Sequence, residues 1–315
     1  MRAALLYGPQ DLRVQEIPDP DPDDAEGIVV EVEAATTCGT DVKMWHHGHR
    51  VLPPYPCAFG HETAGMRADT GERVLVSDSV ACGACPPCRA GRPQICRCPS
   101  WVLGGFAERI AAPEAALHGI PDGLPAAAAA MAEPLAAAVH AVDRGSDAQD
   151  AGILGGGPMG LMLAALLIGQ GRSVTLADPH PERRAQAAQL GADAAARLAR
   201  HELVFEAVGR PEAWRAAVAA AAPGAVVVLV GGCPSGSEVT LDPGPLHYDE
   251  LELRGAFHHA PAEVDRALAA LADGLLPREM LLGPTISLDE LPAALASPSG
   301  GPAKKWVVDP RRTMR

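Results

Sequence analysis

The pattern of apolar and polar positions differs between the first third of the chain and the rest. In the first third, short apolar runs such as 27–34 and 72–76 are separated by turns rich in glycine, proline and aspartate, as between antiparallel strands. From Gly152 onward, short apolar runs alternate with longer helix-forming segments, which is typical of a parallel sheet with crossover helices. The predicted strands there are 152–154, 173–177, 203–207 and 225–230, and the predicted helices are 159–170, 181–190, 211–222 and 262–273. The fold class is therefore predicted as α/β, with two domains. The first third of the chain would form an antiparallel, barrel-like domain, to which the strand-like tail 305–308 also belongs. The middle of the chain would form a doubly wound parallel sheet.

A glycine motif stands where this sheet would bind a nucleotide. Gly155, Gly157 and Gly160 match G-x-G-x-x-G between a predicted strand and a predicted helix, and Asp178 ends the next strand. Glycines allow a tight turn and a close approach of the backbone, so the helix N-terminus can face a pyrophosphate. A carboxylate at Asp178 would bind the ribose hydroxyls and repel a 2′-phosphate, which favours NAD over NADP, although Arg183 nearby works against that preference. This context disfavours the alternative of a glycine turn in a domain without cofactor.

Eight cysteines are present, and four of them form a C-x2-C-x2-C-x7-C cluster at Cys82, Cys85, Cys88 and Cys96. Glycine and proline between them allow a tight loop around one ion. Four thiolates complete a tetrahedral shell, so the predicted zinc would be structural. Cys98 could compete with Cys96 as the fourth ligand, whereas Cys57 and Cys233 fit no pattern and are assigned to packing.

A second group of possible metal ligands lies earlier in the chain. Cys38 follows a predicted strand, and His61 and Glu62 stand together further on. A thiolate, an imidazole and a carboxylate would give three ligands and leave a position for water or substrate, which catalysis requires. Asp41 is the candidate partner for the second ring nitrogen of His61.

Composition and charge narrow the classes of function. The formal net charge of −13 and the 3% of aromatic residues disfavour nucleic acid and anionic membranes as partners. No apolar stretch approaches the roughly 20 residues of a membrane-spanning helix, and the start of the chain is a poor signal peptide. We therefore expect a cytoplasmic protein, and a reducing compartment favours metal over disulfides for the clustered cysteines.

Taken together, these motifs resemble the zinc-dependent medium-chain dehydrogenase/reductase superfamily nearly end to end. The matching segments are 38–41, 60–62, the four-cysteine cluster, 133–136, 155–160, 206–209 and 253–257. Glu133 before Pro-Leu-Ala is similar to the branch of polyol (sorbitol) and threonine dehydrogenases.

The resemblance implies a GroES-like catalytic domain over residues 1–137 and 261–315 and a Rossmann domain over 138–260. It implies a catalytic zinc held by Cys38, His61 and either Glu62 or Glu133, with Thr40 as the hydroxyl that relays the substrate proton. It also implies NAD, two zinc ions per chain and a homodimer or homotetramer. The residues expected to bind the cofactor are Gly155, Gly157, Pro158, Met159, Gly160, Asp178, Arg183, Val208, Val230 and Gly231.

The sequence therefore predicts a zinc- and NAD-dependent dehydrogenase of a small secondary alcohol or polyol. Three alternatives stay open: a zinc dehydrogenase of an amino alcohol, threonine or aminocyclitol; a zinc-free enone or quinone reductase of the same superfamily; and a non-catalytic NAD-binding protein. Two departures from the family pattern affect the proton relay and the pocket. The segment between His61 and Arg73 is short, and Lys43 stands where many relatives carry a relay histidine.

Overall fold

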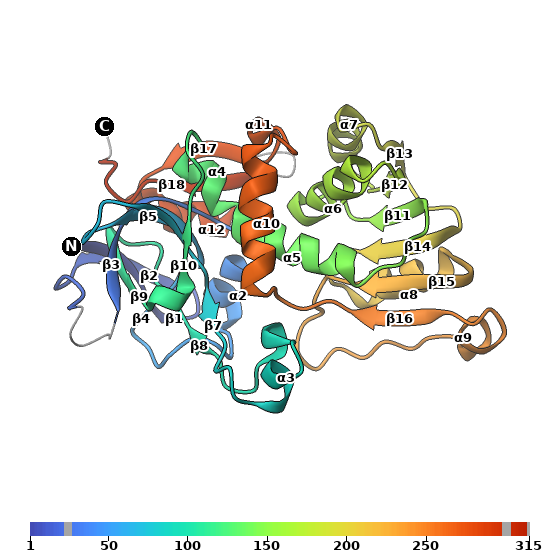
Figure 1. The fold of residues 1–315 in the computed structure, drawn as a ribbon, viewed down its shortest axis with the longest axis horizontal. Helices are drawn as coiled ribbons and strands as arrows, with labels where there is room; N and C mark the ends of the chain where they lie inside the picture. The colour runs from blue at the N-terminus through green and yellow to red at the C-terminus, as the bar shows by residue number, and fades with distance from the viewer. Residues whose placement is uncertain (22–26, 298–303, 314–315) are drawn as a thin grey trace. The chain divides into compact units, whose positions relative to one another are not determined.

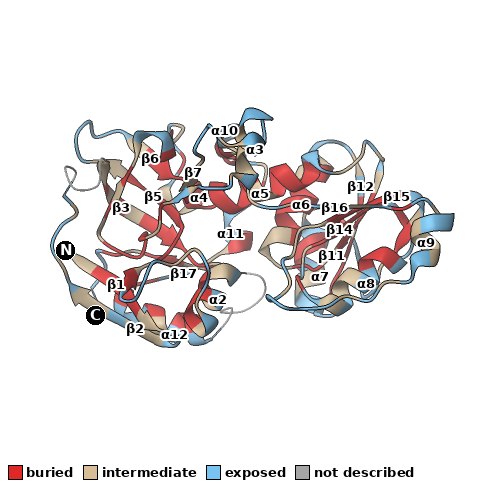
Figure 2. Ribbon diagram, turned by 90° about the horizontal axis from the view of Figure 1, so that it is seen from below, coloured by how far each residue is buried: buried red, intermediate tan, exposed pale blue. Residues whose placement is uncertain are grey.

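The computed structural model describes residues 1–21, 27–297 and 304–313. The chain divides into two compact units, each with its own buried core (Figures 1 and 2). The first unit comprises Met1–Pro134, Ala260–Gly274 and Leu281–Arg315, and the second comprises Leu135–His259 and Leu275–Met280. The first unit is therefore assembled from segments that lie far apart in the sequence.

The second unit is built on a sheet of six parallel strands in the order β13-β12-β11-β14-β15-β16. This is the doubly wound order, in which ligands bind beyond the carboxyl ends of the strands where the order reverses, here between β11 and β14. The parallel sheet predicted from the sequence is confirmed. Its strands are β11 (Asp150–Leu154), β12 (Ser173–Ala177), β13 (Asp193–Ala195), β14 (His201–Glu206), β15 (Ala221–Leu229) and β16 (Glu252–Gly255).

Proline marks the start of several helices. α6 (Pro158–Gly169), α7 (Pro181–Gln189) and α8 (Pro211–Ala219) cross between strands of the parallel sheet, and α10 (Pro261–Ala272) belongs to the first unit. Each begins at a proline, which suits the first helical position because its missing N–H would have no partner there. α6 is apolar on most of its surface, and Leu161, Met162, Leu163 and Leu167 are fully buried. The four predicted helices are thus confirmed, with ends that differ by up to three residues.

The first unit is dominated by antiparallel strands. Its largest sheet runs β10-β6-β5-β3-β18-β17, with β9 also paired to β3, and smaller sheets are β2-β1-β4 and β7-β8. The strand-like tail predicted at 305–308 is β18, which pairs antiparallel with β3 and thereby joins the end of the chain to its beginning. The strands are β1 (Arg2–Gly8), β2 (Asp11–Glu16), β3 (Ile28–Thr36), β4 (Cys57–Ala58), β5 (Glu62–Arg67), β6 (Arg73–Val76), β7 (Ser79–Val80), β8 (Ser100–Trp101), β9 (Arg109–Ala112), β10 (Leu117–Gly119), β17 (Leu282–Ile286) and β18 (Lys305–Val308).

The remaining helices are mostly short. They are α2 (Gly39–His47), α3 (Pro86–Arg89), α4 (Ala126–Ala130), α5 (Ala132–Asp143), α9 (Pro243–Tyr248), α11 (Arg278–Leu281) and α12 (Leu291–Ala296). The core of the first unit includes a cluster in which Met44 and Trp45 of α2 pack with Phe59, Phe106 and Leu288. Within the described ranges, no helix combines the length and the apolar character needed to cross a membrane.

Candidate functional site

The glycine motif forms a tight turn from β11 into α6. Gly155 has φ +104°, a left-handed conformation that favours glycine. A Cβ atom on Gly160 would lie 1.8 Å from the carbonyl oxygen of Gly155, so the first turn of α6 packs against the strand only because that atom is absent. Gly157 caps the helix, and Pro158 and Met159 open it. The helix N-terminus therefore lies at the carboxyl end of β11, where a pyrophosphate can accept its free N–H groups.

Asp178 follows β12 beside this turn. Its side chain is buried, and its two carboxylate oxygens accept hydrogen bonds from Gly156 N and His180 N, both at 2.8 Å. The Arg183 guanidinium lies 3.5 Å from Oδ2. The carboxylate is thus held at the glycine turn, where the sequence predicts contact with a ribose. The Arg183 side chain points toward this carboxylate.

Glu206 plays a similar structural part at the end of β14. Its Oε1 accepts hydrogen bonds from Val208 N and Gly209 N, both at 2.8 Å, and its side chain is fully buried. Burial raises the pKa of this carboxyl group, against the opposing effect of the hydrogen bonds. Gly231 approaches so closely that a Cβ atom would lie 2.2 Å from Gly209 N. Val208, Val230 and Gly231, three of the expected cofactor contacts, therefore lie at the carboxyl edge of the sheet.

In the first unit, Cys38 and His61 meet directly. Cys38 caps the N-terminus of α2, and its Sγ lies 3.1 Å from Nε2 of His61. Asp41 holds both: its Oδ2 accepts from Cys38 N at 2.8 Å, and its Oδ1 lies 3.0 Å from His61 Nδ1. The predicted Asp41–His61 contact is confirmed. Burial lowers the pKa of His61, but the negative charges of Cys38 and Asp41 outweigh it and raise the pKa well above its ordinary value. The cluster therefore attracts a cation.

Glu62, which follows His61, faces a buried lysine. Lys305 Nζ donates to both carboxylate oxygens at 2.5 and 2.8 Å and to the carbonyl oxygen of Thr37 at 3.1 Å. The Thr36 hydroxyl also donates to Glu62. Both charged side chains are almost completely buried. Burial raises the pKa of Glu62 to about 7 against the opposing charge of Lys305, and Glu62 in turn raises the pKa of Lys305.

Glu133 reaches the same place from the first turn of α5. Its side chain is 7% exposed. A carboxylate oxygen of Glu133, a carboxylate oxygen of Glu62 and a ring nitrogen of His61 all lie within 4.8 Å of one another. His61 is thus common to two groups of predicted residues, one with Cys38 and one with Glu62 and Glu133. Thr40 lies in the first turn of α2, where its backbone N–H donates to Cys38 Sγ at 3.2 Å. Lys43, further along α2, is exposed.

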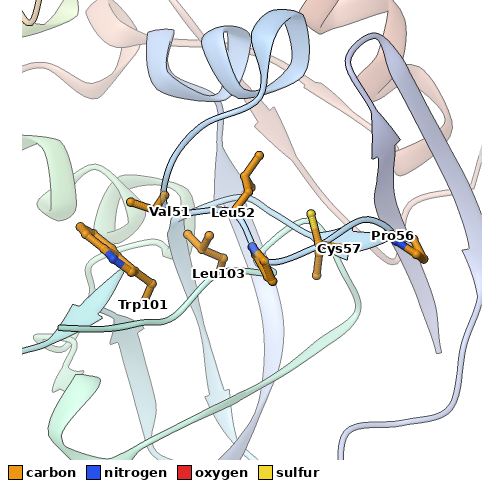
Figure 3. Close-up of a pocket in the computed structure, with 8 residues that line it drawn as sticks. Val51, Leu52, Pro56, Cys57, Trp101 and Leu103 are labelled. Carbon is orange, nitrogen blue, oxygen red and sulfur yellow. The ribbon is translucent and has the colours of Figure 1, made fainter. Parts of the chain in front are cut away.

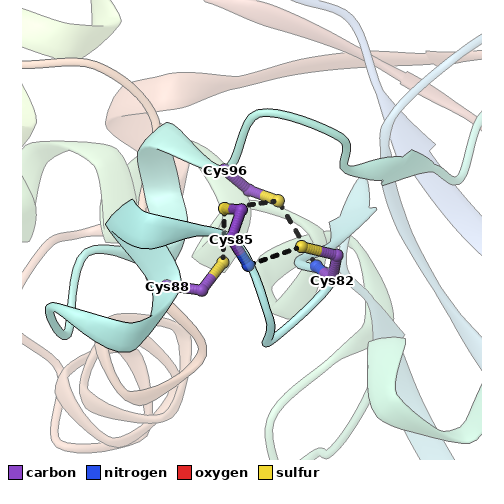
Figure 4. A group of neighbouring side chains, drawn as sticks. All are labelled: Cys82, Cys85, Cys88 and Cys96. Carbon is purple, nitrogen blue, oxygen red and sulfur yellow. Dashed lines mark hydrogen bonds between the residues drawn. The ribbon is translucent and has the colours of Figure 1, made fainter.

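The four-cysteine loop also converges, around α3 (Figure 4). Cys85 Sγ lies 3.4 Å from Cys88 Sγ and 3.8 Å from Cys96 Sγ, and the sulfur atoms of all four cysteines lie within 4.8 Å of one another. Main-chain N–H groups of Ala84 and Cys85 lower the pKa of Cys82 to about 6, which favours its thiolate. Cys96 belongs to this group, and Cys98 is exposed beside Cys82.

Both clusters have donor sets that suit zinc. Ligands about 2.3 Å from a tetrahedral ion stand about 3.8 Å apart, close to the sulfur separations in the four-cysteine loop. Cys38, His61 and a carboxylate that also lies near His61 are donors of the types that zinc accepts, and three such ligands would leave a fourth position open. The four-cysteine loop would therefore fill the coordination shell of its ion, whereas the group around His61 would leave one coordination position for water or substrate.

A glycine turn at the carboxyl edge of the parallel sheet in one unit, and a half-buried cysteine beside a buried histidine and buried carboxylates in the other, suit a dehydrogenase that uses a metal ion and a nicotinamide cofactor. Comparison with known proteins agrees. Residues 24–122 match the family model of the alcohol dehydrogenase GroES-like domain, and residues 158–273 match that of the zinc-binding dehydrogenases. L-threonine 3-dehydrogenase of Chelativorans sp. (strain BNC1) is 30% identical, and the match covers 98% of each chain.

Two solved structures are similar over the whole chain, both with a TM-score of 0.88. One is a putative zinc-binding dehydrogenase from Sinorhizobium meliloti 1021 bound to NADP, 29% identical, and the other is a short chain alcohol dehydrogenase from Escherichia coli CFT073 complexed with NADH, 26% identical. Each match covers 98% of this chain and 99% of the other. The chain belongs to the zinc-dependent medium-chain dehydrogenase/reductase superfamily, among its alcohol and polyol dehydrogenases. The predicted fold class and class of enzyme are confirmed.

Sequence reasoning missed Lys305 and the buried threonines around Glu62. A lysine within the strand-like run Lys305–Val308 was the available signal, because a charged residue in a buried strand needs a partner. Its partner could not be named, since nothing local in the sequence links Lys305 to Glu62.

Proposed function

We propose that this protein oxidises a secondary alcohol or polyol with NAD, using a catalytic zinc ion bound by Cys38, His61 and Glu133. The observation that carries the proposal is that Cys38 and Glu133 each lie close to His61, together with the pairing of Glu62 to Lys305. Both oxygens of Glu62 accept from Lys305, so Glu62 would have to give up that ion pair to serve as a ligand, which supports the choice of Glu133. A second zinc ion would be held by Cys82, Cys85, Cys88 and Cys96 in a structural role.

When bound, zinc would act as a Lewis acid that lowers the pKa of the substrate hydroxyl, and NAD would supply the redox chemistry as hydride acceptor. The residues of the chain orient the reactants and move the proton. Asp41 sets the positions of Cys38 and His61 through its two oxygens. Thr40, half-buried in the first turn of α2, would relay the substrate proton: its hydroxyl accepts that proton while it passes its own proton on toward solvent.

NAD is proposed over NADP because Asp178 presents a carboxylate at the glycine turn. Arg183 would favour a 2′-phosphate, but its guanidinium lies beside the Asp178 carboxylate. We further propose a cytoplasmic homodimer or homotetramer. The four clustered cysteines, which form no disulfide among the described residues, support this location because a reducing compartment keeps thiolates available to metal. An amino alcohol such as L-threonine is the second candidate substrate, favoured by the similarity to L-threonine 3-dehydrogenase.

The test combines zinc analysis with cofactor reduction on a panel of secondary alcohols, polyols and L-threonine. We expect two zinc ions per chain, loss of one in Cys38→Ser, and a smaller zinc loss in Glu133→Ala with a fall in turnover of at least about tenfold. Glu16→Ala, which removes an exposed glutamate at the end of β2, is the matched control and should change neither. An active enzyme without zinc, or a Glu133→Ala variant with unchanged turnover and zinc content, would contradict the proposal.

A further inference from the structure

The four-cysteine loop has a fifth cysteine at its base. The loop is closed by β7 and β8, which pair antiparallel, and the last pair before the loop is Val80 opposite Ser100. Two residues further in this register, Cys82 stands opposite Cys98, on the same side of the pair as Val80 and Ser100. Directly opposite residues of an antiparallel pair have Cβ atoms about 4.5–5.5 Å apart. The topology therefore brings the thiols of Cys82 and Cys98 within reach of each other.

The Cys98 thiol lies at the exposed edge of the cluster. A hydrogen bond to Cys82 and the negative charge of that sulfur raise the pKa of Cys98 to about 11, and Cys96 acts in the same direction. Cys82 and Cys98 are both exposed, whereas Cys85, Cys88 and Cys96 are half-buried. Cys98 is therefore a protonated thiol beside Cys82 and Cys96.

The main chain holds Cys98 at this place. The sulfur of Cys96 accepts a hydrogen bond from Cys82 N at 3.3 Å (Figure 4), and Arg97 N donates to Cys85 Sγ at 3.5 Å. The two residues that directly precede Cys98 are thus both attached to the cluster. A thiol that follows them immediately stays beside the group, even though its side chain is exposed.

We propose that Cys98 is a reserve ligand of the structural zinc ion, able to take the coordination position of Cys82 or Cys96 when that sulfur leaves. The inference deepens the proposed function and rests on its second zinc ion. When Cys98 replaces Cys82, the bond from Cys82 to zinc breaks, a bond from Cys98 to zinc forms, and the proton of Cys98 passes to the departing sulfur. The site then keeps four thiolates and its charge.

A positioned fifth thiol has a measurable consequence. The four ligands of a structural zinc ion share its binding free energy, so the loss of one thiolate should raise the Kd for zinc on the order of a hundredfold. A thiol that already lies beside the vacant position restores this share with little loss of conformational freedom. Because Cys98 contacts Cys82 and Cys96, we expect it to replace either of these two, but not Cys85 at the start of α3.

The test is a set of double-mutant cycles in the full-length protein, with the Kd for zinc measured by competition with a chromogenic chelator. Every protein carries Cys38→Ser, so that the ion measured is that of the loop. Cys82→Ser should still bind zinc tightly, and adding Cys98→Ser should raise the Kd on the order of a hundredfold. Beside Cys85→Ser, the same addition should have little effect. Adding Cys233→Ser to Cys82→Ser is the matched control, because it removes a thiol of the second unit, and it should leave the Kd unchanged.

Cobalt in place of zinc gives a second readout. The intensity of the sulfur-to-cobalt charge-transfer absorption grows with the number of bound thiolates. We expect Cys82→Ser to keep the intensity of the intact loop, and the pair Cys82→Ser and Cys98→Ser to lose about a quarter of it, which is one thiolate in four. If Cys82→Ser does not fold, Cys96→Ser with and without Cys98→Ser decides in its place.

The two possible failures are distinct. If adding Cys98→Ser changes the Kd of neither Cys82→Ser nor Cys96→Ser, the reserve-ligand inference is overturned, and the proposed dehydrogenase with its four-cysteine zinc site stands. If the Cys38→Ser protein with an intact loop binds no zinc, the second zinc ion of the proposed function fails, and the inference fails with it.

Discussion

Asp41 and Asp178 each use both carboxylate oxygens, and each thereby positions a functional segment. Asp41 joins Cys38 N to the ring of His61, and Asp178 joins Gly156 N of the glycine turn to His180 N at the start of α7. A carboxylate that accepts hydrogen bonds from its own framework is pre-oriented, so less conformational freedom is lost when a ligand binds. Each of these two aspartates therefore holds the local backbone in place and also orients a group of the candidate site.

Replacing Asp178 by alanine tests its part in cofactor choice. The substitution removes a ribose acceptor and a negative charge, and it frees Arg183 to meet a 2′-phosphate. We expect the Kd for NAD to rise at least about tenfold, since a lost charged hydrogen bond is worth about 1.5–3 kcal/mol, and the preference for NAD over NADP to shrink. Fluorescence titration of both cofactors measures this, with Asp193→Ala on exposed β13 as the control. A wild type that prefers NADP would contradict the assignment.

The four-cysteine loop depends on metal more than any helix or strand does. Its regular structure is limited to α3 and a single 3-10 turn at Pro93–Ile95, and neither contains a buried residue. With so little apolar burial, the loop has no core of its own, and a tetrahedral ion would provide the cross-link.

Cys85→Ser should therefore lower the stability of the protein, whereas Cys38→Ser should remove its activity. We expect Cys85→Ser to lose one zinc ion and to lower the melting temperature, because metal binding at a closed site contributes folding free energy. Cys38→Ser should lose the other ion and its activity while keeping the melting temperature within a few degrees. Elemental analysis and calorimetry on both variants, with Cys98→Ser as the control outside the cluster, provide the check. Full zinc content in Cys85→Ser would show that Cys85 is not a ligand.

The strand β18, near the end of the chain, belongs to the first unit and contributes one half of a deeply buried ion pair there. Lys305 on β18 binds Glu62, which follows His61, and the carbonyl oxygen of Thr37, which precedes Cys38. Trp306 N also donates to the Thr37 hydroxyl at 3.1 Å. One lysine thus joins both segments that carry the candidate metal ligands.

Lys305→Met should lower the free energy of unfolding by about 3–5 kcal/mol, since Glu62 then stays buried without a countercharge. Adding Glu62→Gln should recover much of this loss, and Lys305→Arg should lose less than Lys305→Met because its charge is kept. Without Lys305 the pKa of Glu62 rises further above its ordinary value of 4.5. Protonation then favours the folded state, so stability of Lys305→Met should fall as pH rises from 5 to 8. Urea unfolding at several pH values measures this, and equal loss in the single and double variants would contradict the coupling.

The features of the fold and of the site that could be predicted from the sequence are those set by residues close together in the chain. The glycine turn, the parallel strands around it and the spacing of Cys82, Cys85 and Cys88 follow from neighbouring residues, because turn geometry and strand periodicity act over a few positions. The Asp41–His61 contact was predictable because a ligand histidine needs a partner for its second nitrogen.

Contacts between distant segments required the folded chain. Glu133 and Lys305 are far from His61 and Glu62 in the sequence, and Lys305 reaches Glu62 because β18 pairs with β3. No local propensity encodes which buried charges will meet. A pocket of the first unit has the same origin, since residues from 51–58 and from 101–103 come together as its lining only in the folded chain (Figure 3). Local sequence specified the kinds of site in this protein, and long-range packing selected the partners within them, because a side chain's environment depends on all the segments that surround it.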